Sequence, residues 1–290
     1  MHRRSFLAGL ALAPVAITTL AQAGQDRLFT VSDGSFSLPA SMLNRGRKPE
    51  EIKAALGGAE SYISQLNITV LERADGFTVF DCGAGANFIP GAGKLMESLK
   101  VAGVEAEKVK HLVFTHAHPD HLWGSLDDFG APAFPNATFH VSQGEYDFWH
   151  RKDILNLMPE DRQVFATGAQ RHFKELTPVL KQFKPEQEIL PGLFAAATPG
   201  HTPGHVSYDV KVGSDIITVA GDALTHPILS FAYPEWAGGF DHEADVAAAT
   251  RKKLLDRLAS EKRMMVGYHL PSGGRGRVEK AGAAYRFISG

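Results

Sequence analysis

Three imidazoles and one carboxylate lie within six residues of this sequence: His116, His118, Asp120 and His121. Neutral imidazole and carboxylate are the nitrogen and oxygen donors that Zn²⁺ and similar ions prefer. Two histidines separated by one residue at the end of an extended segment point to the same side. The turn that begins at Pro119 then brings the next two side chains round to a second point. The pattern therefore predicts ligands for metal ions.

The apolar segment before this cluster predicts a strand that positions it. Residues 111–115 are short, β-branched and aromatic, which is typical of a buried strand. Pro119 and Asp120 begin a turn, and a helix is expected to start within residues 122–126. The ligands are therefore expected on the loop after a strand, where α/β sheets commonly build their sites.

Three later segments also run from apolar residues to a candidate ligand. Residues 193–198 lead into a rigid Pro/Gly loop, residues 216–222 form a strand that ends in Gly-Asp, and residues 263–269 form another strand. The candidate ligands at these three ends are His201, Asp222 and His269. Four such strand ends are expected to converge on one edge of a sheet sandwich.

In this order, the motif His-x-His-x-Asp-His and the three later ligands resemble the metallo-β-lactamase superfamily. The resemblance covers most of the chain after residue 23, and it includes Phe80-Asp-Cys-Gly83, which is similar to the strand-end Asp-x-Gly of that family. Within the superfamily the chain most resembles the exported methyl parathion hydrolase and lactonase-like branch. The segments behind this narrower resemblance are Gly83–Ala86, Gly221–Leu224, Phe240–Asp241, Thr250–Arg251 and His269–Pro271.

The resemblance implies a hydrolytic site with two divalent metal ions, for which Zn²⁺ is the expected identity. It assigns the first ion to His116, His118 and His201, and the second to Asp120, His121 and His269. Asp222 would bridge the two ions, with a hydroxide bridging them on the open side. The residues themselves agree, because structural zinc sites are usually rich in Cys and this chain has one Cys.

The chemistry of such ions and the positions of nearby residues suggest further roles around them. Asp120 is expected to be catalytic: it would orient the hydroxide and pass a proton to the leaving group. Asp81 and Thr115 are expected to hold ligand rings in position. His205 is expected to pack beside the site rather than bind metal, and His226, four residues after Asp222, is expected to face the pocket.

The substrate is expected to be a small molecule, and a neutral, fairly apolar ester or lactone is preferred. Relatives in the branch open lactones, arylesters or organophosphate triesters. Six side chains are expected to line the substrate pocket: Trp123, Trp149, His226, Phe231, Tyr233 and Trp236. No basic patch indicates a nucleic-acid partner, and a homodimer stays open as an assembly.

Four other interpretations stay open. A β-lactam hydrolase of the same fold is disfavoured because the lactamases lack the bridging carboxylate expected at Asp222. A nuclease is disfavoured by export and by the absence of a basic patch. An iron-dependent oxygen-chemistry enzyme would require bound iron and oxygen consumption. From a different class, the chain would be an exported metal-binding protein without turnover.

The first 23 residues indicate an export signal rather than part of the fold. Arg3 and Arg4 precede an apolar run over residues 6–20, and Ala21-Gln-Ala23 resembles a small-residue cleavage site. The paired arginines are similar to a twin-arginine signal, with an ordinary secretory signal as the alternative. Export to the bacterial periplasm is expected, with no membrane contact after cleavage, and the charge changes from −2 to 28 − 32 = −4.

Residues 24–290 are expected to form one hydrolase domain of the α+β class. The sequence predicts hairpins across Asp75-Gly76 and Gly213-Ser214, and helices over residues 91–101, 143–150 and 242–258. Strands with helices between and after them suggest two sheets packed face to face and covered by helices. This arrangement matches the αββα four-layer sandwich that the resemblance implies.

Overall fold

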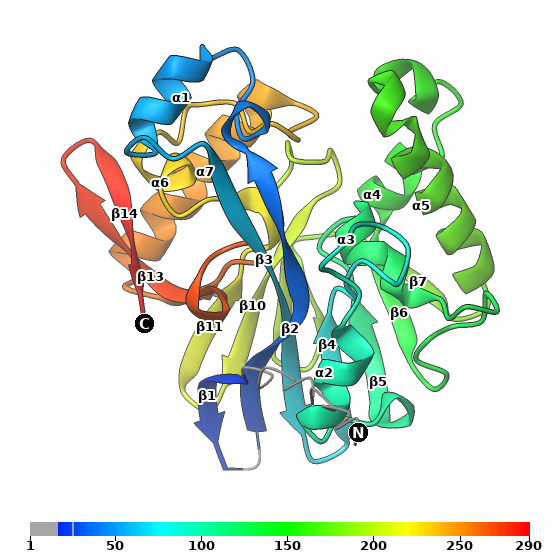
Figure 1. The fold of residues 1–290 in the computed structure, drawn as a ribbon. Coiled ribbons are helices and arrows are strands. Elements are labelled where there is room, and N and C mark those ends of the chain that lie inside the picture. The colour runs from blue at the N-terminus through cyan, green and yellow to red at the C-terminus, as the bar shows by residue number, and fades with distance from the viewer. Residues whose placement is uncertain (1–16, 25) are drawn as a thin grey trace, which may run out of the picture.

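The apolar and alternating runs of the sequence become the strands of two seven-stranded sheets in the computed structural model, which describes residues 17–24 and 26–290 (Figure 1). The first sheet has the order β1-β2-β3-β4-β5-β6-β7, antiparallel up to β4 and parallel from there to β7. Its strands are β1 (Thr18–Ala23), β2 (Asp26–Pro39), β3 (Ser61–Arg73), β4 (Gly76–Phe80), β5 (Val109–Val113), β6 (Thr138–Ser142) and β7 (Leu180–Phe183).

The second sheet has the order β14-β13-β12-β11-β10-β9-β8. Its pairs are antiparallel except for β11 with β12, which is parallel. Its strands are β8 (Gln187–Leu190), β9 (Leu193–Ala197), β10 (Val206–Val212), β11 (Asp215–Val219), β12 (Met264–Val266), β13 (Arg275–Ala281) and β14 (Ala284–Ser289). The hairpin predicted at Asp75-Gly76 is formed by β3 and β4, and the one at Gly213-Ser214 by β10 and β11.

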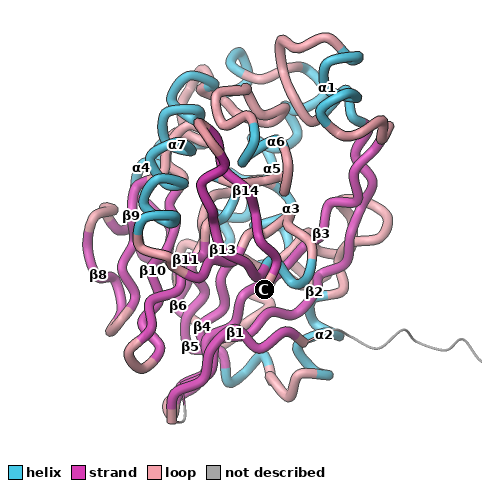
Figure 2. Tube along the Cα trace, turned by 90° about the vertical axis from the view of Figure 1, so that its left-hand side faces the viewer, coloured by secondary structure: helices cyan, strands magenta, loops and turns pink. Residues whose placement is uncertain are grey.

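Helices cover the outer faces of the two sheets, as Figures 1 and 2 show. They are α1 (Pro49–Ala55), α2 (Leu95–Val101), α3 (Pro119–Leu122), α4 (Gln143–Trp149), α5 (Gln163–Leu176), α6 (Leu229–Ala232) and α7 (Ala244–Ser260). Phe173 and Leu176 of α5 belong to the core of the first sheet, and Leu254 and Leu258 of α7 to that of the second.

A separate core lies between the sheets. Phe80 and Val113 of the first sheet share one cluster of buried side chains with Tyr208, Val219 and Val266 of the second. Burial of such side chains contributes roughly 1.5–3 kcal/mol each. The layers are therefore helix, sheet, sheet and helix, which confirms the predicted αββα sandwich.

Several element boundaries differ from the sequence prediction. The helix expected to start within residues 122–126 begins at Pro119, because proline is favoured in the first turn of a helix, where its missing N–H is not needed. The helices expected at residues 91 and 242 begin at Leu95 and Ala244.

The predicted export signal lies mostly outside the described residues, because residues 1–16 are not among them. Its last part forms β1, which pairs with β2. In the described ranges, no helix has both the length and the apolar character needed to cross a bilayer.

Candidate metal centre

The seven predicted ligands come together where strands of both sheets end. His116 and His118 lie on the loop after β5, and Asp120 and His121 lie in the single turn of α3. The other three follow β9, β11 and β12: they are His201, Asp222 and His269. Each of the seven residues is no more than 8% exposed, so residues far apart in the chain form one buried polar cluster.

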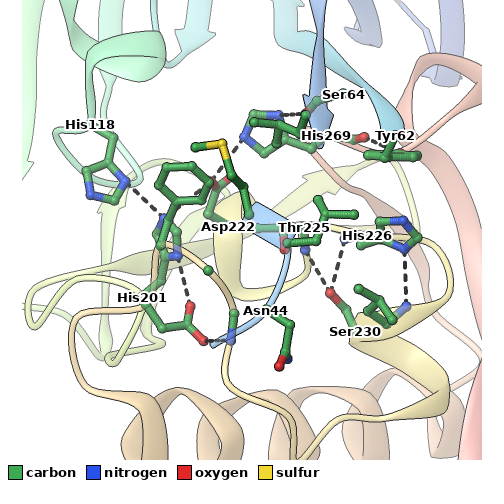
Figure 3. A pocket seen from close by; sticks show the side chains of 18 of the residues that line it. Asn44, Tyr62, Ser64, His118, His201, Asp222, Thr225, His226, Ser230 and His269 are labelled. Carbon is green, nitrogen blue, oxygen red and sulfur yellow. Dashed lines mark hydrogen bonds and ion pairs between the residues drawn. The ribbon is translucent and has the colours of Figure 1, made fainter. Parts of the chain in front are cut away.

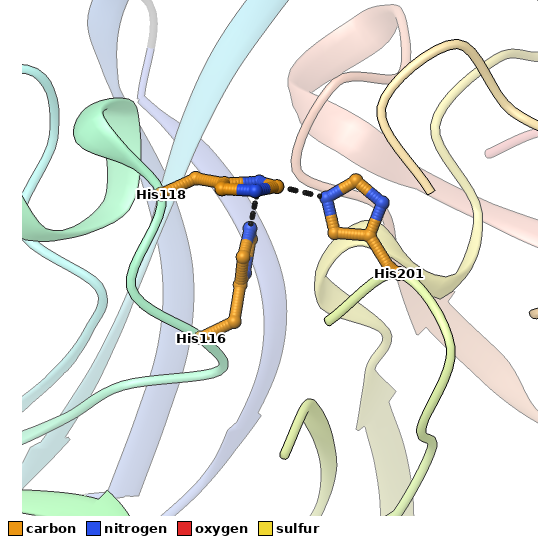
Figure 4. A group of neighbouring side chains, drawn as sticks. All are labelled: His116, His118 and His201. Carbon is orange, nitrogen blue, oxygen red and sulfur yellow. Dashed lines mark hydrogen bonds between the residues drawn. The ribbon is translucent and has the colours of Figure 1, made fainter. Parts of the chain in front are cut away.

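The first ligand set has three nitrogens that converge. His118 Nδ1 lies 3.0 Å from His116 Nε2 and 3.0 Å from His201 Nε2 (Figure 4). Tetrahedral zinc with nitrogen ligands at 2.0–2.1 Å holds its ligand atoms about 3.3–3.4 Å apart. The observed spacing is close to that value, so the three rings fit one ion of this size.

The second ligand set joins a carboxylate to two rings. Asp120 Oδ2 lies 3.4 Å from His269 Nε2 and 3.8 Å from His121 Nε2. Asp222 lies between the two sets: its Oδ2 is 3.3 Å from His201 Nε2 and 3.1 Å from His269 Nε2. Its Oδ1 is 3.4 Å from His121 Nε2. The Asp222 carboxylate is thus within reach of both sets, which is the position that a bridging ligand needs.

Two buried atoms in this cluster indicate what it holds. His121 Nε2 and Asp222 Oδ1 have no hydrogen-bond partner within residues 17–24 and 26–290. A buried polar atom without a partner costs about 1–3 kcal/mol. A divalent cation accepts donation from both an imidazole nitrogen and a carboxylate oxygen, so these residues fit a metal centre.

Every histidine ligand has a second contact through the nitrogen that faces away from the cluster. His121 Nδ1 donates to Asp81 Oδ2 at 2.8 Å, and His201 Nδ1 donates to Asp241 Oδ1 at 3.1 Å. The remaining contacts are His116 Nδ1 with Thr115 Oγ1, His118 Nε2 with His242 Nε2, and His269 Nδ1 with Ser64 Oγ and the Gln65 carbonyl. Such contacts fix the orientation of each ring.

Asp81 occupies a left-handed backbone position directly after β4, with φ of 61°. Its carboxylate accepts hydrogen bonds from Thr115 N at 2.7 Å, from Thr115 Oγ1 at 2.8 Å and from His121. Sparsely populated backbone conformations cost roughly 1–3 kcal/mol and persist where surrounding contacts require them. Here the strained residue ties the end of β4 to the segment that carries the ligands, in the way expected of Asp81 and Thr115.

Burial and neighbouring charges divide the histidines into two groups. Burial, together with the nearby rings, holds the pKa values of His116 and His118 well below the ordinary value, so both rings are neutral and ready to donate to a cation. At His121 and His269, burial lowers the pKa, but the carboxylate of Asp222 and its acidic neighbours raise it by more than burial lowers it. The net shift of both pKa values is upward. Of these four rings, His121 and His269 are therefore the ones at which protons compete more strongly with a metal ion.

Sequence reasoning missed two residues that support the centre. Asp241 accepts from His201 and also from Arg251 Nη2 at 2.9 Å, and His242 contacts His118. Phe240–Asp241 and Thr250–Arg251 carried the narrower family resemblance but were not assigned to the site. His205 lies beside the site, as expected. Its Nε2 accepts a hydrogen bond from the Asp222 backbone N–H at 3.0 Å, and His205 is not one of the clustered candidate ligands.

A cavity of about 210 Å³ opens beside the ligands (Figure 3). His118, Asp120, His201, Asp222 and His269 form part of its wall. Of the six side chains expected to line the pocket, His226 and Trp236 do so. The other four are not among the lining residues. Trp123 packs against Phe88 and His172, and Trp149 donates its Nε1–H to Glu145. Phe231 packs against Phe287, and Tyr233 stacks on Trp236.

Two curated relatives from Bacillus share part of the chain. An uncharacterized protein, YobT, of Bacillus subtilis (strain 168) is 30% identical over 166 residues, which are 55% of this chain and 62% of the relative. An N-acyl homoserine lactonase of a Bacillus species is 28% identical over 175 residues, which are 58% of this chain and 59% of that protein. The chain thus matches about three fifths of the length of these relatives.

Solved structures match over nearly the whole chain. AidC, described as a dizinc quorum-quenching lactonase in complex with a product, superposes with a TM-score of 0.89 at 25% identity and covers 95% of this chain and 98% of its own. AbOPH, described as a hydrolase in the beta lactamase superfamily, gives a TM-score of 0.86 at 25% identity, with 96% and 98% covered.

The methyl parathion hydrolase branch stays a prediction, because these matches do not test it. They do support membership of the wider superfamily. The family described as the Metallo-beta-lactamase superfamily matches residues 62–269, which span all seven candidate ligands. Fold, ligand cluster and family match agree, and the chain belongs to the metallo-beta-lactamase superfamily.

Proposed function

We propose that this chain is a hydrolase of ester-type bonds, with lactones as the preferred substrates, and that its seven clustered side chains hold two divalent cations, most simply Zn²⁺. The observation that carries the proposal is the position of the Asp222 carboxylate, within 3.3 Å of His201 and 3.1 Å of His269 and on the wall of a cavity. One carboxylate shared between two ligand sets is suited to a pair of ions.

Divalent cations held in this way supply Lewis-acid polarisation of a carbonyl oxygen and lower the pKa of coordinated water. The chain's own contribution is to place the groups that act with them. The Asp120 side chain lines the cavity, with its Oδ2 3.4 Å from His269 Nε2. A carboxylate there is within reach of a substrate: it can accept a proton from the attacking water and pass that proton to the leaving oxygen.

The rest of the cavity favours an apolar substrate. Its wall away from the ligands is formed largely by hydrophobic side chains, among them Phe36, Phe88, Phe165, Leu229 and Trp236. Apolar walls with a few placed polar groups are typical of small-molecule sites. A lactone with an apolar substituent matches this wall, and N-acyl homoserine lactonases are among the relatives.

Metal analysis combined with hydrolysis assays tests the proposal. We expect about two equivalents of zinc in the purified full chain, hydrolysis of γ-lactones that carry an acyl or alkyl substituent, and loss of activity on chelation. Asp120→Asn should retain the fold and lower turnover by roughly 10²–10⁴-fold. The control is Asp153→Asn, which changes an exposed acid that pairs with Arg151.

Three results would contradict this assignment. Turnover in the chelated protein would remove the role of the ions, and wild-type turnover in Asp120→Asn would remove that of the carboxylate. A single equivalent of metal in fully active protein would rule out the pair of ions.

A further inference from the structure

The His226 ring lines the cavity, yet it takes no part in the ligand cluster. It is 4% exposed, and its Nδ1 accepts hydrogen bonds from the backbone N–H groups of Ile228 at 3.0 Å and Leu229 at 3.1 Å. A nitrogen that accepts two hydrogen bonds carries no hydrogen of its own. The hydrogen of the neutral ring therefore lies on Nε2.

That Nε2–H group is buried and has no hydrogen-bond partner within the described parts of the chain. Burial lowers the pKa of His226 to about 4, so the ring is neutral near pH 7. The backbone contacts and the neutral charge leave one tautomer and one direction for the donor. Buried donors in folded proteins are nearly always paired, so the partner of this one has to be supplied from the cavity.

Neighbouring side chains show which part of a substrate could pair with it. The Tyr62 ring packs on His226 with 4.3 Å between ring centroids, and Tyr62 Oη donates to the His269 carbonyl at 2.7 Å. His226 is thus separated from the ligand His269 by one ring, and Figure 3 shows it across the pocket from His118. A substrate group that pairs with this hydrogen would therefore differ from the group held at the ligands.

Two other polar groups on this side of the cavity have partners within the protein. Ser64 Oγ contacts His269 Nδ1 at 2.9 Å, and Ser230 Oγ accepts from the backbone N–H groups of Thr225 and His226 at 3.0 and 3.1 Å. The Nε2–H of His226 is therefore a donor that a substrate can use without displacing a contact of the fold.

We infer that His226 is a specificity-determining residue whose Nε2–H donates a hydrogen bond to a carbonyl oxygen of the substrate outside the scissile ester, such as the amide oxygen of an N-acylated lactone. The inference rests on the proposed lactone hydrolysis and adds the substrate class. A lactone with this acceptor pairs the buried donor, whereas a plain alkyl lactone leaves it unpaired. A site built to pair such a group rejects the analogue that lacks it.

Two substitutions separate the donor from the backbone contacts of the same ring. His226→Asn places a carbonyl oxygen near the position of Nδ1, so it keeps an acceptor for Ile228 and Leu229 but removes the outer donor. His226→Gln reaches the outer position with an N–H group and weakens the inner acceptor instead. If His226 acts only in the structure, the variant that weakens the inner acceptor, His226→Gln, should be the more impaired. If His226 recognises the substrate, the variant that lacks the outer donor, His226→Asn, should be the more impaired.

The experiment uses the full chain loaded with zinc and two probes of equal length, N-hexanoyl homoserine lactone and an α-alkyl-γ-butyrolactone. The measured quantity is the ratio of kcat/KM for the amide probe to that for the alkyl probe. We expect His226→Asn to lower this ratio about tenfold, equivalent to about 1.4 kcal/mol, and His226→Gln to restore most of it.

An unchanged ratio in His226→Asn, an equal loss with both probes, or a ratio in His226→Gln as low as in His226→Asn would each overturn the inference while leaving the proposed function in place. A wild-type chain that hydrolyses neither probe would overturn both. If His226→Asn does not fold, the inference is tested on the wild-type protein with a third lactone, which carries a ketone in place of the amide. Because it keeps the carbonyl oxygen and lacks the N–H, it should match the amide probe, and a rate equal to the alkyl probe would overturn the inference.

Discussion

His118 and His242 meet through their Nε2 atoms, which lie 3.1 Å apart, although the two residues are 124 positions apart in the chain. His118 Nδ1 faces the other ligands. A metal ion bound at Nδ1 would leave the His118 hydrogen on Nε2, and His242 would then accept through its Nε2 and keep its own hydrogen on Nδ1. An imidazole thus takes the place in which a carboxylate or carbonyl usually orients a metal-bound histidine.

Replacing His242 tests this orientation directly. We expect His242→Phe, which keeps a ring but removes the acceptor, to weaken metal affinity or activity by about 10–100-fold, the usual effect of losing such a contact. His242→Gln supplies an acceptor oxygen and should recover most of the loss. Competition with a chromophoric chelator measures the affinity. Equal affinity in His242→Phe and wild type would show that the contact does not orient the ligand.

Asp241 holds His201 on one carboxylate oxygen and Arg251 on the other, and all three side chains are almost fully buried. Burial raises the pKa of this carboxyl, but the hydrogen bond from His201 and the charge of Arg251 together lower it by more. The resulting pKa is well below the usual range. Asp241 is therefore a stable anion that orients one ligand and neutralises a buried cation.

We expect Asp241→Asn to lower both zinc affinity and the free energy of unfolding. In one orientation the amide presents an N–H₂ group to the His201 Nδ1–H, and in either it leaves the Arg251 charge without its partner. Removing one member of a buried ion pair costs about 3–5 kcal/mol, and denaturant unfolding measures it.

A matched control is Asp209→Asn, because Asp209 pairs with Arg257 and Arg263 on α7 and the segment before β12, away from the ligands. This change should affect stability alone. Zinc affinity that falls equally in both variants would contradict a specific role for Asp241.

The sequence was sufficient to predict which seven side chains cluster, because each candidate ligand follows a strand and carries unusual chemistry. The β3–β4 turn at Asp75-Gly76 and the β10–β11 turn are likewise local signals that fixed two hairpins in the right place. A strand end constrains where its next few residues lie, so four ends predicted from the chain were enough to bring seven side chains together.

Contacts that depend on tertiary packing were not predictable in this way. A single loop histidine such as His242 has no local pattern that distinguishes a ligand's partner from a solvated side chain. Aromatic character did not decide the pocket wall either: Trp149 is fully buried, with its Nε1–H donated to Glu145 at 2.7 Å, whereas Trp236 lines the cavity. Which face of an element is covered depends on the neighbouring elements.

His172 makes the stability of the fold depend on pH without touching a ligand. It lies on α5 with its Nδ1 2.9 Å from Ser125 Oγ, and burial lowers its pKa to about 4. The unfolded chain binds this proton near pH 6.5. Between pH 6.5 and 4 the unfolded state therefore holds more protons than the folded state, and the free energy of unfolding falls as the pH falls.

We expect His172→Gln to remove up to about 1.4 kcal/mol per pH unit from the slope of stability against pH in that window. Above pH 7 the difference in stability between variant and wild type should be constant, which provides the internal control. Urea unfolding at pH 7.5, 5.5 and 4.5 measures it. Parallel curves for the two proteins would show that His172 does not bind its proton preferentially in the unfolded state.

β1 occupies residues that the sequence assigned to the end of an export signal. Leu20 is 6% exposed and belongs to the core between the sheets, and β1 lies alongside β2 from Thr18 to Ala23. Cleavage after Ala23 would remove this strand and the burial of Leu20. A processed form that begins after residue 23 is therefore expected to be less stable than one that keeps the strand.

Two proteins starting at residues 17 and 24 test this expectation by urea unfolding. Burial of a leucine contributes about 1.5–3 kcal/mol, so the shorter protein should lose at least that amount. Leu20→Ala in the longer protein should account for most of the difference, because it removes the buried side chain and keeps the strand. The mass of the protein isolated from its own cells then shows which form exists. Equal stability of the two proteins would mean that β1 adds nothing to the fold, and cleavage after Ala23 would then carry no penalty.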